Sequence, residues 1–118
     1  MSDVQEKSLK PTLLIVDDEN DIRYTLNLLF QSVGVNCISA ADGESALELV
    51  QQYHPIDAII SDINMPNMDG IEFLEKMRQV GIYIPLVFLS GRASKQDAVR
   101  ALQLGAHDFI EKPYEVMK

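Results

Sequence analysis

The chain has 118 residues, of which 47% are hydrophobic and 24% are charged, values that describe one globular domain of ordinary composition. The net charge of −8 argues against direct binding to nucleic acid or to an anionic membrane, because both depend on clustered Lys and Arg, and it favours a cation as a small partner. No run approaches the ~18 apolar residues of a membrane span, and the polar N-terminus lacks a signal-peptide core, so we expect a cytoplasmic protein without membrane contact.

The first part of the chain is expected to contain a tail, a strand and a helix. Residues 1–11 have mixed charge and no periodicity, which predicts a flexible N-terminal lead. Leu13–Val16 is a continuous apolar run, typical of a parallel strand covered on both faces, and it ends in acidic residues. Apolar residues then recur at helical spacing from Ile22 to Val33, with Asn20 or Asp21 placed to cap the helix.

The middle of the chain repeats this pattern. Val35–Ser39 is expected to be a second strand, and Asp42-Gly43 to open a helix that ends before His54-Pro55. Ala58–Ser61 is an apolar run that leads directly into Asp62. A cluster of turn residues then ends this third strand: Asn64, Pro66, Asn67 and Gly70.

The last part adds two strands and two helices. A helix is expected to start at Gly70 or Ile71, and Leu86–Leu89 to form a fourth strand that ends in Ser90. A helix follows from Lys95 to Leu104, and Asp108–Glu111 is a fifth strand that ends in Lys112. Strands and helices alternate throughout, which predicts an α/β fold with a parallel sheet, helices on both faces and right-handed crossovers.

Polar side chains follow four of the expected strands at their carboxyl ends: Asp17 and Asp18, Asp62, Ser90, and Lys112. In an open parallel sheet these ends meet at one edge, where ligands bind. Three carboxylates gathered there repel one another unless a cation joins them, and oxygen ligands without nearby His or Cys favour Mg²⁺. Each residue alone could be a cap, a turn former or a surface charge, but such roles do not require all five to share one edge.

A phosphoryl group would fit beside such a metal ion. Lys112 and Ser90 would supply a positive charge and a hydroxyl donor for its oxygens, and Asp62 would be the nucleophile, because a carboxylate can accept a phosphoryl group as an acyl phosphate.

Other reactive side chains are expected to be structural. His54 and His107 have no metal-ligating neighbour at useful spacing, and Cys37, the single cysteine, is expected to be a small core residue. Met65 and Met68, which flank the turn after Asp62, are either core residues or an adaptable apolar docking rim.

Four segments together closely resemble the CheY-like receiver domains of two-component response regulators, over about residues 12–117. The resemblance implies a flavodoxin-like, doubly wound sheet of five parallel strands in the order 2-1-3-4-5, with the site between the first and third strands. The segments are Ile15-Val16-Asp17-Asp18-Glu19, Ser61-Asp62-Ile63-Asn64-Met65-Pro66-Asn67-Met68-Asp69-Gly70, Leu89-Ser90-Gly91 and Phe109-Ile110-Glu111-Lys112-Pro113.

The resemblance also implies a role for each site residue. Asp62 would be phosphorylated by a histidine kinase or a histidine phosphotransfer protein, and Lys112 would pair with the phosphoryl group. Ser90 would be the switch hydroxyl, and Phe109 the switch aromatic, here without a phenolic hydroxyl. The Mg²⁺ ligands would be Asp18, Asp62, Asp17 through water, and the backbone carbonyl of Asn64.

Two further expectations concern the ends of the fold and its partners. The family has a full fifth helix, but only Tyr114 to Lys118 remain for it here, so we expect a receiver domain over residues 12–118 that is truncated at that helix. The expected partner is an output domain or a target protein. The apolar surface that the missing helix leaves open would be covered in a longer regulator, or by a second copy in a homodimer.

Two alternative functions stay open at this level. A haloacid-dehalogenase-like phosphohydrolase also combines an Asp nucleophile with Mg²⁺, Ser and Lys, but there the nucleophile comes first in the chain and a second acid follows two residues later. Here the acidic pair comes first and Asn64 occupies the second position, which disfavours turnover of phosphate esters. A pseudo-receiver that acts only by binding is the other alternative.

Overall fold

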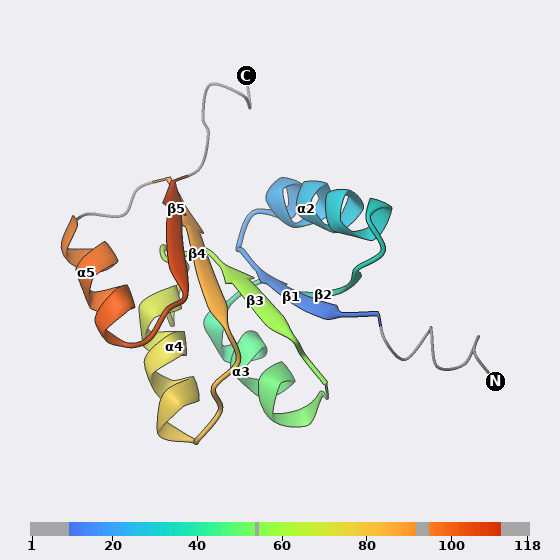
Figure 1. The fold of residues 1–118 in the computed structure, drawn as a ribbon. Helices are drawn as coiled ribbons and strands as arrows, with labels where there is room; N and C mark the ends of the chain where they lie inside the picture. Colours follow the sequence, from blue (N-terminus) through green and yellow to red (C-terminus); the bar gives the residue numbers. More distant parts are fainter. Residues whose placement is uncertain (1–9, 54, 92–94, 112–118) are drawn as a thin grey trace.

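The computed structural model describes residues 10–53, 55–91 and 95–111, which form one five-stranded sheet in the order β2-β1-β3-β4-β5 (Figure 1). Every neighbouring pair is parallel, so the predicted flavodoxin-like α/β fold and its strand order are confirmed. The elements in chain order are β1 (Thr12–Val16), α2 (Asn20–Ser32), β2 (Asn36–Ala40), α3 (Gly43–Gln52), β3 (Ala58–Ser61), α4 (Gly70–Gln79), β4 (Leu86–Ser90), α5 (Lys95–Gln103) and β5 (Asp108–Glu111).

Short polar side chains begin two of the helices. The carboxylates of Asp42 and Asp69 accept hydrogen bonds from the amides of Ser45 (2.7 Å) and Glu72 (2.8 Å), which satisfies donors that a helix leaves unpaired in its first turn.

The expected cap of α2 is wrong. The N-cap is Glu19, which makes no side-chain cap hydrogen bond, and Asn20 is already the first helical residue. The helix starts there because the amide of Arg23 donates to the carbonyl of Glu19 (3.1 Å), which closes the first helical turn. As a result, the side chain of Asn20 accepts a hydrogen bond from Arg23 instead of capping the backbone.

The central strand β1 is buried along its whole length, as its continuous apolar run predicted. It pairs with β2 from Thr12↔Asn36 to Val16↔Ala40, and with β3 from Leu13↔Ala58 to Val16↔Ser61. Because it pairs with every residue of β1, β2 begins and ends one residue later than the predicted strand Val35–Ser39. Since Val16 and Ser61 lie side by side, the residues that follow them, Asp17 and Asp62, emerge next to each other.

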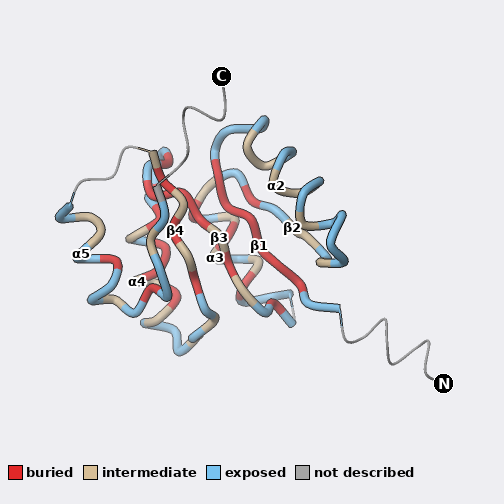
Figure 2. Tube along the Cα trace, turned by 45° about the horizontal axis from the view of Figure 1, so that its top comes forward, coloured by how far each residue is buried: buried red, intermediate tan, exposed pale blue. Residues whose placement is uncertain are grey.

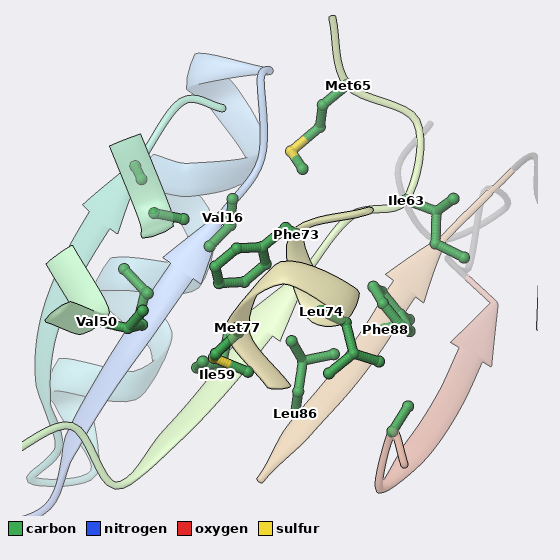
Figure 3. Close-up of a cluster of buried hydrophobic side chains, with 14 of the residues drawn as sticks. Val16, Val50, Ile59, Ile63, Met65, Phe73, Leu74, Met77, Leu86 and Phe88 are labelled. Carbon is green, nitrogen blue, oxygen red and sulfur yellow. The ribbon is translucent and has the colours of Figure 1, made fainter. Parts of the chain in front are cut away.

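The main core lies between the sheet and helices α3, α4 and α5 (Figure 1). In Figure 3, Phe73, Leu74 and Met77 of α4 pack over the strands. Each of these large side chains is fully buried and stabilises the fold by about 1.5–3 kcal/mol. Other fully buried members of this core are Leu14, Val16, Val50, Ile59, Leu86 and Phe88.

The opposite face of the sheet carries α2 alone among the described helices (Figure 1). Helix α2 has no buried residue, whereas β1 beneath it is buried throughout (Figure 2). The expected fifth helix would fall after β5, in residues 112–118, which lie outside the described residues. None of the described helices is long and apolar enough to cross a membrane.

Candidate functional site

Three carboxylates meet at the carboxyl edge of the sheet, and we call Asp17, Asp18 and Asp62 the acidic trio. Each offers one carboxylate oxygen, and these oxygens all lie within 4.8 Å of one another. Asp17 and Asp62 are buried, with 3% and 6% of their surfaces exposed, while Asp18 is exposed. The amide of Asp62 donates to the carbonyl of Val16 (2.8 Å), which joins the two strand ends. The sequence prediction that these residues converge is therefore correct.

The loop after β3 closes tightly around Asp62. Its Oδ1 accepts a hydrogen bond from the amide of Ile63 (2.7 Å), and its carbonyl accepts one from the Ser61 hydroxyl (2.8 Å). The amide of Gly70 then donates to the carbonyl of Ile63 (2.8 Å), which returns the chain to the start of α4. A Cβ at position 70 would lie 2.1 Å from the Asp62 carbonyl oxygen, so only glycine fits at this point.

The turn between β1 and α2 is also held by hydrogen bonds. The Oδ1 of Asp17 accepts from the amide of Glu19 (2.9 Å), and the amide of Asp17 donates to the carbonyl of Ala40 (3.2 Å). The guanidinium of Arg23 donates through Nη1 to the carbonyl of Asp17 (2.5 Å) and through Nη2 to the Oδ1 of Asn20.

Arg23 was not among the predicted site residues, although the sequence contains a signal for it. A cation near the N-terminus of a helix opposes the helix dipole and needs a compensating partner. The turn three to six residues upstream, Asp17-Asp18-Glu19-Asn20, offers the oxygen acceptors that the guanidinium uses.

The remaining predicted site residues lie along the same edge or outside the described residues. Ser90 ends β4 and is buried with 1% exposed, and Phe109 in β5 is half-buried, packed against the core and paired in register with Phe88. Asn64 is exposed in the loop that follows Asp62. Lys112 and His54 lie outside the described residues.

The other reactive side chains have structural roles. Met65 and Met68 are buried, with 8% and 9% exposed, and both belong to the main core, so the core alternative is correct and the docking rim is wrong. Cys37 is half-buried rather than a core residue, and burial raises the pKa of its thiol. The amide of His107 donates to the carbonyl of Leu86 (2.7 Å), and its side chain is exposed.

Comparison with known proteins gives a consistent result. Residues 13–118 match the family model described as "Response regulator receiver domain". The Regulatory protein AtoC of Escherichia coli strain K12 is 38% identical over 104 residues, which cover 88% of this chain and 22% of that protein. The Regulator of RpoS of the same strain is 41% identical over 101 residues, or 86% of this chain and 30% of that protein.

Solved structures agree with these relatives. The chemotaxis protein CheY4 of Vibrio cholerae superposes with a TM-score of 0.81 at 33% identity, over 88% of each chain. The present chain spans less than half of the curated relatives that it matches, from 22% of AtoC to 44% of the transcriptional regulatory protein PrrA of Mycobacterium tuberculosis.

Proposed function

Because the chain belongs to the response regulator receiver domain family, a family of signalling domains, we propose that it is a switch that accepts a phosphoryl group on Asp62. One observation carries this proposal: the acidic trio, with Asp62 held at the end of β3 beside Asp17 of β1. A buried carboxylate fixed by a short loop and flanked by two others is suited to act as a nucleophile toward a phosphoryl group next to a cation.

The donor set of the trio fits Mg²⁺. All three side chains offer hard oxygen ligands, which this ion prefers, and the exposed position of Asp18 leaves room for water and a phosphoryl group. We propose Asp18 and Asp62 as direct ligands, Asp17 as a ligand through water, and the carbonyl of Asn64 as a backbone ligand. The ion would offset the negative charge of the carboxylates and of the phosphoryl oxygens.

The proposed reaction transfers a phosphoryl group from a phosphohistidine on a histidine kinase or a phosphotransfer protein. A carboxylate oxygen of Asp62 forms a bond to phosphorus while the bond from phosphorus to the imidazole nitrogen breaks. The electron pair stays on that nitrogen, which takes up a proton. Lys112 and Ser90 are proposed to stabilise the phosphoryl oxygens, and the chain catalyses only its own phosphorylation and dephosphorylation.

We propose that the signal is read out on the face formed by α5 and β5. Ser90 is buried at the end of β4, two residues after Phe88, which pairs in register with Phe109 of β5, and α5 has one buried residue, Ala101. A helix held by so small an apolar contact can shift when Ser90 bonds the phosphoryl group. Ser90→Ala should still be phosphorylated but lose most of the accompanying amide shift changes in α5; identical changes in both proteins would contradict this route.

The phosphohydrolase alternative is weaker on two grounds. Asn64 cannot donate a proton to a leaving group as an acid would, and the acidic pair precedes the nucleophile. The pseudo-receiver alternative does not explain why the three carboxylates of the trio converge. The longer relatives support a further proposal, that an output segment or a target protein receives the signal from this domain.

Incubation with acetyl phosphate and Mg²⁺, followed by intact mass measurement, tests the function. We expect one phosphoryl group per chain in the wild type and in Asp21→Asn, a control that removes an exposed carboxylate outside the trio. Asp62→Asn should accept none. Continuous release of phosphate would indicate a hydrolase, and the absence of any label would indicate a domain that acts only by binding.

A further inference from the structure

We infer that Arg23 is a positioning residue for the acidic trio, a role that rests on the proposed metal-dependent function. It would hold the turn between β1 and α2 in the conformation from which Asp17 and Asp18 face Asp62. The inference comes from the hydrogen bonds of the guanidinium and from the position of Arg23 in the helix.

The guanidinium of Arg23 connects both ends of this turn. Nη1 donates to the carbonyl of Asp17, the first residue after β1, and Nη2 donates to the side chain of Asn20, the first residue of α2. The backbone amide of Arg23 also donates to the carbonyl of Glu19 (3.1 Å). One residue therefore makes three hydrogen bonds to a segment of four residues that contains two members of the trio.

The Asp17 carboxylate and amide make further hydrogen bonds, in addition to the bond from Arg23 to the Asp17 carbonyl. Its carboxylate accepts from the amide of Glu19, and its own amide donates to the carbonyl of Ala40. Asp17 is thus held at its amide, its carbonyl and its side chain. Asp18 is exposed, so the direction of its carboxylate depends on the backbone of this turn more than on packing.

The choice of acceptors distinguishes positioning from simple charge compensation. Both hydrogen bonds of the guanidinium go to neutral oxygens, one from a carbonyl and one from an amide. If Arg23 acted mainly as a positive charge beside the trio, it would compete with Mg²⁺, and its removal would strengthen metal binding. If it holds the turn, its removal weakens metal binding, because the carboxylates lose their arrangement.

Calorimetric titration with Mg²⁺, without any phosphate donor, separates these possibilities. For Arg23→Ala we expect the Kd to rise on the order of 10-fold, the lower end of the range for residues that orient metal ligands. Arg23→Lys keeps the charge but lacks the planar fork, so its Kd should rise to a similar extent. Asn20→Ala removes one acceptor of the fork and should give a smaller rise in the same direction.

Arg78→Ala is a matched control. Arg78 also donates to backbone carbonyls, those of Ile82 (3.0 Å) and Gly105 (3.3 Å), but it lies near the other edge of the sheet. Its loss should lower stability and leave the Kd for Mg²⁺ at the wild-type value. Each variant is titrated only under conditions in which circular dichroism shows that it is folded. If Arg23→Ala does not fold, the test rests on the Kd values of Arg23→Lys and Asn20→Ala.

An unchanged or lower Kd in both Arg23→Lys and Asn20→Ala, with normal metal binding by the wild type, would overturn the positioning role and leave the proposed function intact. A wild-type Kd in Arg23→Lys with a raised Kd in Arg23→Ala would also overturn it, because the planar fork that connects Asp17 to Asn20 would then not be needed. If the wild type binds no Mg²⁺, the metal site and the role of Arg23 fail together.

Discussion

The two faces of the sheet differ sharply in burial, although the same strands build both. On the face under α3, α4 and α5, which we call the covered face, the side chains of β3 and β4 are at most 1% exposed; they are Ile59, Ser61, Leu86, Phe88 and Ser90. On the face that carries α2, the open face, their neighbours Ile60, Val87 and Leu89 are half-buried, and Ile110 of β5 is 50% exposed. Among the described residues, burial therefore depends on whether a helix lies over a strand, and not on the apolar character of the strand alone.

Helix α2 explains why the open face is incompletely covered. It packs over β1 and β2, and several of its large apolar side chains are exposed: Tyr24 by 67%, Leu28 by 52% and Leu29 by 57%. Ile110 lies at the far edge of the sheet, on the strand that ends the order β2-β1-β3-β4-β5. The single described helix on this face does not reach across five strands, so among the described residues the half of the open face over β3, β4 and β5 has the least cover.

The largest expected effect compares adjacent residues on the two faces of β4. Phe88→Ala should lower the free energy of unfolding by about 3–5 kcal/mol, because it leaves a cavity in the covered core. Leu89→Ala should lower it by only about 1–2 kcal/mol, because the half-exposed side chain loses less transfer free energy and leaves no closed cavity. Urea unfolding measures both, and equal losses would show that the two faces are equally packed.

Covering the open face should be the next largest effect. A C-terminal extension that adds a helix there should stabilise the domain by about 1.5–3 kcal/mol for each large apolar side chain that it fully buries. Without it, we expect the 118-residue chain to bind a hydrophobic dye or to self-associate in sedimentation experiments. A chain that stays monomeric at high concentration, binds no dye and gains nothing from the extension would contradict this view.

A third prediction compares alanine substitutions at two glycines, Gly70 beside Asp62 on the covered face and Gly34 after α2. Gly70→Ala would place a Cβ 2.1 Å from the Asp62 carbonyl oxygen and 2.9 Å from the Phe88 ring, which should cost about 1–3 kcal/mol. Because the acceptor must move, phosphorylation by acetyl phosphate should slow on the order of 10²-fold.

Gly34 provides the control for this change. It follows α2 with a φ of +87° and has no atom within 4 Å of an added Cβ. Gly34→Ala should cost about 1–2 kcal/mol through backbone strain alone and leave the phosphorylation rate unchanged. Equal phosphorylation rates in the two variants would show that the packing of Gly70 does not position Asp62.

The smallest expected effect concerns pH. Cys37 lies in register with Leu13, on the open face, and burial raises the pKa of its thiol above the ordinary value. The folded state therefore holds this proton more tightly than the unfolded state. The resulting stability is fully present below the unfolded pKa and is lost as pH rises through the folded pKa.

Urea midpoints of the wild type and Cys37→Ala, measured near neutral pH and at a pH of about 10, test this shift. The wild type should lose slightly more stability at the higher pH than the variant does. The difference should be small because the thiol is only half-buried. If the variant loses as much stability as the wild type, the thiol does not contribute.

Much of the fold and the convergence of the acidic trio could be predicted from the sequence. Continuous apolar runs such as Leu13–Val16 can be satisfied only by burial on both faces, and turn residues mark where each run ends. Because carboxyl ends of parallel strands share one edge, the order of these runs was enough to place Asp17, Asp18 and Asp62 together. The resemblance to receiver domains rested on the same residues, and the match of residues 13–118 confirms it.

What the sequence could not determine depends on contacts between distant residues and on exact helix starts. Whether Met68 is core or surface was decided by the close approach of the β3–α4 loop to Gly43, which no local pattern encodes. The roles of Asn20 and Arg23 depended on α2 starting one residue earlier than a capping preference suggests. Which residues of each strand are fully buried was also a tertiary result, because a continuous apolar run looks the same on both faces and does not show where the helices lie.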